Sequence, residues 1–177
     1  MKNDTKRLVT LAMLVSVAMI LSYLESLVPP LVAIPGVKLG LSNVATLFAL
    51  LLLGPLSAVS VSLVRVFLSA LLFGNAMALI FSLSGACLSL LVMIIFSRTK
   101  IFSPVGISII GAVAHNAGQI IAAAIVLKTS AIVYYLAPLV VSGTLAGTVI
   151  GTASGLLAKR LEKILKLGRE DMGKSKY

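Results

Sequence analysis

A near-continuous series of apolar segments is the feature that most constrains how this chain can fold. Of its 177 residues, 59% are hydrophobic and 11% are charged, whereas soluble domains contain about 45–50% apolar and about 25% charged residues. A soluble domain of this size would lack the polar residues needed to cover its surface. The lipid bilayer is the solvent that fits this composition, and the same values exclude a disordered chain.

Six of these segments are expected to form an all-α bundle of membrane-spanning helices, since a spanning helix needs about 20 mostly apolar residues. The second segment is short, so its true start could lie in the loop before it. A turn is required between Leu39 and Phe73, because one helix over this range would be about 52 Å long against a hydrocarbon core of about 30 Å. Gly54-Pro55 is the strong breaker there, and Gly74-Asn75 marks the next turn. The segments are Leu8–Val28, Leu39–Leu53, Leu56–Phe73, Ala76–Phe96, Val105–Leu127 and Ile132–Ala158.

Positive charge is distributed as expected for six helices that span the cell membrane, with both chain ends in the cytoplasm. The net charge is +10, from 15 Lys and Arg against 5 Asp and Glu. In this arrangement the outer loops carry only Lys38 and Lys128, in agreement with the positive-inside rule. We expect a membrane domain over residues 1–158 and a basic cytoplasmic tail over residues 159–177, with the lipid bilayer rather than nucleic acid as the partner of these cations. The inner cations are Lys2, Lys6, Arg7, Arg98, Lys100, Lys159, Arg160, Lys163, Lys166, Arg169, Lys174 and Lys176.

The ionisable residues argue against an enzyme. Both aspartates, Asp4 and Asp171, lie in the polar ends of the chain, so the membrane body has no paired carboxylates for acid–base or Mg²⁺–diphosphate chemistry. One His and one Cys cannot form a structural zinc site, and no GxxxxGK[ST] phosphate-binding loop occurs. We therefore expect no catalytic activity, no cofactor and no metal.

Two charged residues are expected at membrane depth, where ionisable side chains are costly and are functional candidates. Arg65 lies nine residues into the third segment, near mid-membrane, and Glu25 lies near the outer end of the first. Arg65 either pairs with Glu25 or binds an anionic ligand, and the sequence does not favour one alternative over the other.

A second polar group lies in the fifth segment. Gln119 lies four residues after His115 and three residues after Asn116. The three side chains therefore project from one broad sector of a helix. Such residues can hold helices together, at about 0.6 kcal/mol per contact, or bind a ligand, and three in one turn favour a ligand site. Gly111 and Gly118 flank His115 and allow close approach of another helix or of the ligand.

A loop and two small-residue patterns complete the candidates. The apolar loop Pro29–Asn43 contains three prolines, and it either covers a pocket as a lid or rests on lipid headgroups. Glycines at every fourth position from Gly143 to Gly155 allow a neighbouring helix, of this chain or of another protein, to pack backbone to backbone. Ala12 and Ser16 form a smaller version of this pattern on the first segment.

Several of these motifs occur together over about residues 8–158: Pro35–Asn43, Leu-Val-Arg at 63–65 followed by Gly74-Asn75, Ser84-Gly85 and His115–Gln119. The combination resembles the Gx transporter family, whose members are often labelled heptaprenyl diphosphate synthase component I. The synthase label does not fit this sequence, because prenyl synthases use aspartate-rich motifs that the chain cannot form.

The wider layout resembles the substrate-binding S components of energy-coupling-factor (ECF) transporters. This resemblance implies a subunit that binds a small vitamin-like solute, or one related to isoprenoids or quinones, for uptake. It also implies a T component, which Ala12 and Ser16 would contact, and two ATPases that supply movement. The candidate solute-binding residues are Glu25, Lys38, Asn43, Arg65, Asn75, His115, Asn116 and Gln119.

An alternative function is an accessory membrane subunit that transports no solute. Some relatives are encoded beside genes for quinone synthesis or flavin-based extracellular electron transfer, so a role in a prenyl-lipid, quinone or electron-transfer pathway stays open. A small molecule bound against the fifth segment would favour the transporter, and a packed interior would favour the accessory subunit.

The predicted topology can be tested by labelling single cysteines with a membrane-impermeant reagent. Cysteines placed between Leu31 and Lys38 should react from outside the cell, and cysteines placed near Lys100 should not. Outside labelling near Lys100 would contradict the six-helix arrangement.

Overall fold

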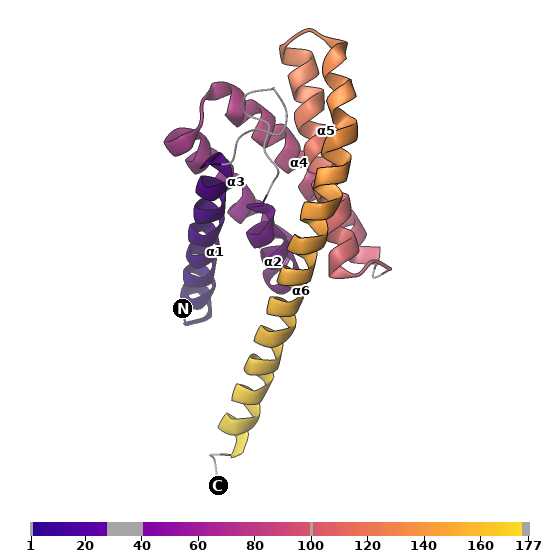
Figure 1. Cartoon of the computed structure of the whole chain (residues 1–177). Coiled ribbons are helices and arrows are strands. Elements are labelled where there is room, and N and C mark those ends of the chain that lie inside the picture. Colours follow the sequence, from indigo (N-terminus) through magenta and orange to yellow (C-terminus); the bar gives the residue numbers. More distant parts are fainter. Residues whose placement is uncertain (1, 28–40, 100, 175–177) are drawn as a thin grey trace.

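The computed structural model describes residues 2–27, 41–99 and 101–174, and places side chains for residues 5–27, 41–99 and 101–160. Every regular element in this part of the chain is a helix, as the apolar pattern predicts (Figure 1). The elements are α1 (Lys2–Leu27), α2 (Asn43–Leu53), α3 (Pro55–Phe73), α4 (Ala76–Thr99), α5 (Pro104–Val126), the 3₁₀ helix η1 (Ser130–Tyr135) and α6 (Leu136–Lys174).

Five stretches of helix are long and apolar enough to cross a membrane: Thr5–Leu27, Pro55–Phe73, Ala76–Thr99, Pro104–Val126 and Ser130–Arg160. The apolar helix α2 has 11 residues and is about 16 Å long, which is half the thickness of a hydrocarbon core. It begins at Asn43 rather than at the predicted Leu39. The predicted all-α membrane bundle is confirmed.

The two predicted breaks separate consecutive helices. Gly54 is the single residue between α2 and α3, and its φ of 87° lies in the region that favours glycine. Pro55 follows at the first position of α3, where its missing N–H would be unpaired in any case. Gly74-Asn75 separates α3 from α4.

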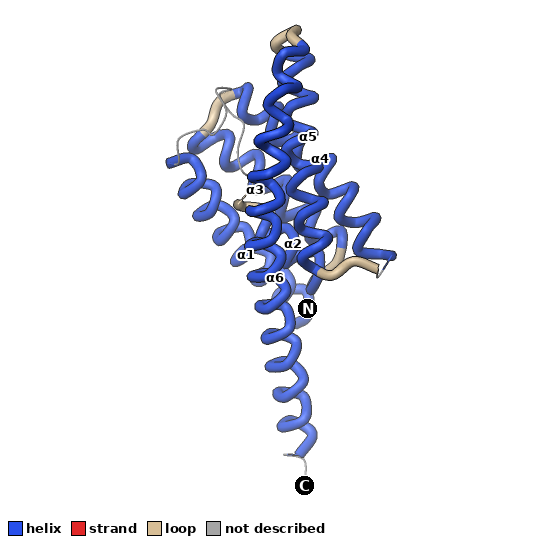
Figure 2. The backbone as a smooth tube through the Cα atoms, turned by 45° about the vertical axis from the view of Figure 1, so that its right-hand side comes forward, coloured by secondary structure: helices blue, strands red, loops and turns tan. Residues whose placement is uncertain are grey.

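The helices form two groups that pack against each other. α1, α2 and α3 contact one another in one group, and α5 lies between α4 and α6 in the other. Contacts of α2 with α6 and of α3 with α4 join the groups. Both chain termini lie at the same end of the molecule, opposite the connection between α5 and η1 (Figures 1 and 2).

Two clusters of buried apolar residues form the core. A first cluster near the terminal end draws on α1 to α6, and a second draws on α4, α5, η1 and α6. On α5, Ile107 belongs to the first cluster and Ile120 to the second, and the polar residues predicted for this helix lie between them. We call the buried polar residues of α1, α3, α5 and the start of α2 the polar layer. Its main members are Glu25, Ser42, Asn43, Arg65, His115, Asn116 and Gln119.

The glycine stripe of α6 packs against α5 of the same chain, which answers a question the sequence left open. A Cβ atom added to Gly147 would lie 2.7 Å from Ile109 Cα, and one added to Gly151 would lie 2.6 Å from Val105 Cα. Atoms cannot approach so closely, so the backbones of the two helices touch only because these side chains are absent.

The opposite face of α5 contacts α4 in the same way. A Cβ on Gly118 would lie 2.8 Å from the Ser84 carbonyl oxygen, and a Cβ on Gly85 would lie 2.8 Å from the His115 carbonyl oxygen. The Ser84 hydroxyl donates to the Gly118 carbonyl oxygen at 2.9 Å. Glycines therefore let α5 approach both neighbours closely, and the partner that they admit on this face is a helix.

Helix α6 continues without interruption through the predicted domain boundary at residue 158 and ends at Lys174. The predicted tail is therefore largely an extension of the last helix, which projects beyond the bundle in Figure 1.

Substitution Gly147→Leu should lower the free energy of unfolding by about 1–3 kcal/mol, because the new side chain would meet the α5 backbone. Thr148→Leu is the control, since Thr148 is the exposed neighbour of Gly147 on the same helix. Thermal unfolding in detergent should show a lower melting temperature for Gly147→Leu only. Equal melting temperatures for both variants would mean that this contact contributes little.

Candidate functional site

Arg65 is the centre of the first part of the polar layer. It lies on α3, is 4% exposed, and donates from Nη1 to the hydroxyl oxygen of Ser42, the residue before α2. Glu25 of α1 is also buried and is close enough for its charge to attract the guanidinium group. Three helices therefore converge on one buried cation.

Two of the three guanidinium nitrogens remain available. Arg65 Nε and Nη2 have no hydrogen-bond partner among the residues that the structure describes. A buried donor left unpaired costs about 1–3 kcal/mol, and more when it is charged. Arg65 can therefore interact with Glu25 and still bind another group. The two roles considered from the sequence, pairing with Glu25 and binding an anionic ligand, are compatible.

Asn116 has a partner within the bundle. Its Nδ2 atom donates to the carbonyl oxygen of Leu139 on α6 at 2.7 Å. The approach is close because Gly143 has no side chain, and a Cβ there would lie 2.8 Å from the same nitrogen. This bond joins α5 to α6, so at least part of the predicted polar sector holds helices together.

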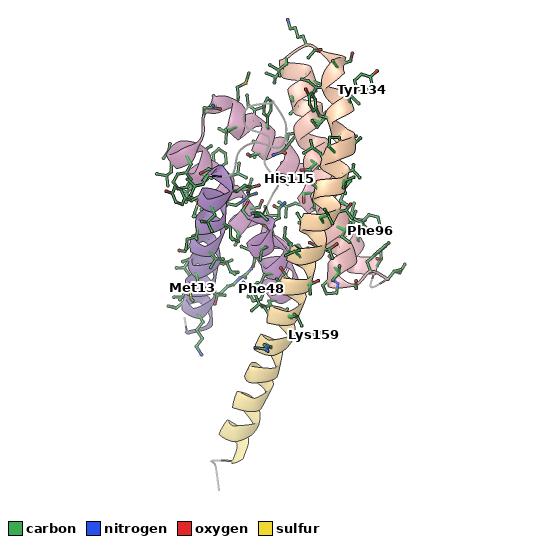
Figure 3. The ribbon with its side chains drawn as sticks, in the orientation of Figure 1. Met13, Phe48, Phe96, His115, Tyr134 and Lys159 are labelled. Atoms are coloured by element: carbon green, nitrogen blue, oxygen red, sulfur yellow. The ribbon has the colours of Figure 1, made fainter. Side chains whose placement is uncertain are left out.

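His115 and Gln119 contact α4 instead of α6. A Cβ on Gly85 would lie 3.0 Å from His115 Cε1 and 2.9 Å from Gln119 Cγ. Both residues are fully buried, and Figure 3 labels His115 in the interior of the bundle. Neither amide atom of Gln119 has a hydrogen-bond partner in the described part of the chain. Gln119 therefore offers one acceptor and one donor group to a polar ligand.

The other candidate site residues occupy different surroundings. Asn43, the first residue of α2, is 6% exposed, and its Nδ2 has no partner within the described ranges. Asn75 is exposed, and its Oδ1 accepts from the backbone N–H of Ala78 at 2.8 Å, which caps the start of α4. Lys38 lies outside the described residues, as does most of the loop Pro29–Asn43, so the lid stays a prediction.

Ala12 and Ser16 both lie on the exposed side of α1. The Ser16 hydroxyl donates to the Ala12 carbonyl oxygen at 3.0 Å, which leaves a small and nearly apolar surface. Their contact with another subunit stays a prediction.

The sequence interpretation missed several hydroxyl groups of the polar layer. Ser42 was not among the candidate site residues, although it holds Arg65. Four further hydroxyls are buried without a partner among the described residues, and two of them lie three residues before a buried charge, a helical spacing that could have identified them. They are Ser22, Thr46, Ser62 and Ser89.

The chemistry of the polar layer suits binding of a polar molecule. It combines a cationic donor, amide groups, hydroxyls and one carboxylate within an apolar bundle. Among the described residues, no group of three or more His, Cys, Asp or Glu could hold a metal ion.

Comparison with known families finds a match over most of the chain. The family model described as heptaprenyl diphosphate synthase component I matches residues 14–157, which include all of α2 to α5 and η1 and just over half of α1 and of α6. No curated protein and no solved structure matches the chain. The match agrees with the motif resemblance, and the apolar helices are consistent with a multi-pass membrane protein.

Two substitutions on α5 should have opposite effects on stability. Asn116→Leu removes the bond to Leu139 and should lower the free energy of unfolding by about 0.6–1.7 kcal/mol. Gln119→Met keeps the length of the side chain and removes two unpartnered polar atoms, so it should leave the stability of the ligand-free protein unchanged or higher. Thermal unfolding of both variants in detergent checks this, and a destabilised Gln119→Met would show that the amide has a partner in the protein.

Proposed function

Because the chain belongs to the heptaprenyl diphosphate synthase component I family, also called the Gx transporter family, we propose that it is the solute-binding subunit of a membrane transporter. In this role it resembles the S component of an ECF transporter and binds a small vitamin-like solute, or one related to isoprenoids or quinones, for uptake. It binds the solute without altering it chemically.

The unpartnered groups of the polar layer carry this proposal. Arg65 Nε and Nη2 and both amide atoms of Gln119 are buried with no hydrogen-bond partner among the described residues. Around them lie two clusters of apolar side chains. A bilayer supplies no water to such groups, so a bound polar molecule or ordered water must satisfy them. A solute that binds both Arg65 and Gln119 would contact both helix groups.

The proposal extends to orientation and partners. Both termini lie at one end of the molecule, which fits a protein in the cell membrane with both ends in the cytoplasm. The exposed small residues Ala12 and Ser16 of α1 are the proposed contact with a T component. Two ATPase subunits would then supply the energy, since the sequence has no phosphate-binding loop of its own.

One observation favours the alternative role of an accessory subunit that transports no solute. The bond from Asn116 to Leu139 satisfies one polar group entirely within the bundle, as a purely structural protein would require. In that role, ordered water would be the partner of Arg65 Nε and Nη2 and of the Gln119 amide.

Mass spectrometry of small molecules released from the purified protein distinguishes the two functions. Wild type should release one molecule in near-stoichiometric amount, and Gln119→Met should release much less from the same amount of folded protein. Thr152→Val is the control, because Thr152 is an exposed polar residue of α6, remote from the polar layer in sequence. Release of no molecule from wild type, or equal release from all three proteins, would contradict solute binding at this site.

A further inference from the structure

We propose that the solute carries an oxyanion, either a carboxylate or a phosphate, that binds the Nε–Nη2 edge of Arg65 beside the start of α2. This inference rests on the proposed function and adds the charge and chemical class of the solute. It follows from the arrangement of hydrogen-bond donors around one buried cation.

The free edge of Arg65 has the geometry for such a group. Ser42 accepts from Nη1 and fixes one side of the guanidinium group. The remaining edge presents Nε–H and an Nη2–H bond that point in parallel, and neither nitrogen has a partner among the described residues. Two parallel donors match the paired oxygens of a carboxylate or phosphate, whereas a single carbonyl or hydroxyl oxygen would fill only one of them.

The start of α2 lies beside Arg65, because Ser42 contacts this arginine, and it carries a further donor. Asn43 follows Ser42 directly, and its buried Nδ2 has no partner in the described part of the chain. The side chain of Ser42 does not cap the helix, and its oxygen accepts from Arg65. The backbone N–H of Val44 donates to the Leu41 carbonyl oxygen at 3.1 Å, so the main contribution of α2 is the positive end of its dipole, which favours a negative charge at this place.

Glu25 sets the strength of this site. Its carboxylate attracts the guanidinium group without removing the two free nitrogens, and it repels an incoming anion. A carboxylate beside the cation keeps the empty site near neutrality, which lowers the cost of burying Arg65. It also predicts a direction: removing the Glu25 charge should strengthen oxyanion binding.

Thermal unfolding of the full chain in dodecyl maltoside tests the proposal, with inorganic phosphate and benzoate as probes and chloride keeping the ionic strength constant. Both probes should raise the melting temperature of wild type. Arg65→Lys keeps the charge but loses the parallel donors, so the probe concentration at half-effect should rise about tenfold or more. Glu25→Gln should lower that concentration several-fold. Arg98→Gln is the matched control, because Arg98 is an exposed arginine at the end of α4, and it should leave the concentration unchanged.

Equal responses of wild type and Arg65→Lys would overturn the proposal. If Arg65→Lys does not fold, an unchanged response of Glu25→Gln overturns it instead. A separate titration uses dioctanoyl phosphatidylglycerol, and Arg65-dependent stabilisation by this lipid alone would assign the site to a headgroup and contradict an anionic solute. In the mass-spectrometry experiment, wild type could release a neutral or cationic molecule that Gln119→Met does not retain. This result would support the transporter function and exclude an oxyanion as the solute.

Discussion

The close contact of α5 with α4 on one face and with α6 on the other is the constraint on which the rest of the structure depends. Glycines on all three helices remove the side chains that would otherwise separate the backbones. In lipid there is little hydrophobic gain from joining apolar helices, so close packing and hydrogen bonds must hold them together. The same contacts fix His115, Asn116 and Gln119 in the interior, because α5 has little freedom to rotate between its neighbours.

The polar layer shows two different solutions to the burial of polar groups in an apolar bundle. The Nδ2 atom of Asn116 donates to the backbone of α6, and this contact contributes to packing, whereas its buried Oδ1 has no partner among the described residues. Arg65 is only partly satisfied, by Ser42 and by the charge of Glu25. A protein selected for stability alone would replace such a residue with an apolar one. The persistence of unpaired donors at a defined position therefore favours binding over a purely structural role.

The sequence was sufficient to predict much of this fold. Apolar segment lengths predicted the five long membrane-spanning stretches within a few residues, and Gly54-Pro55 and Gly74-Asn75 marked the turns. Burial of Glu25, Arg65, His115, Asn116 and Gln119 also followed from their positions in these segments. Helical periodicity could not show which neighbour each residue of α5 faces, because one sector is broad enough to contact both α4 and α6. The site role of Asn75, which the resemblance implies, stays a prediction, and the structure shows this residue as an exposed helix cap.

The single-residue turn at Gly54 lies nearly midway along the chain between Ser42 and Arg65. Ser42 lies 12 residues before Gly54 and Arg65 lies 11 residues after it, so both are about 17–18 Å from the turn along their helices. Their contact therefore depends on the number of residues between each of them and the turn, as the pairing of residues in a hairpin depends on the length of its loop. A one-residue insertion in either arm would rotate the residues beyond it by about 100° and move them by about 1.5 Å. Because the connection is a single residue, the position of the buried cation relative to Ser42 is determined by the lengths of the two helical stretches.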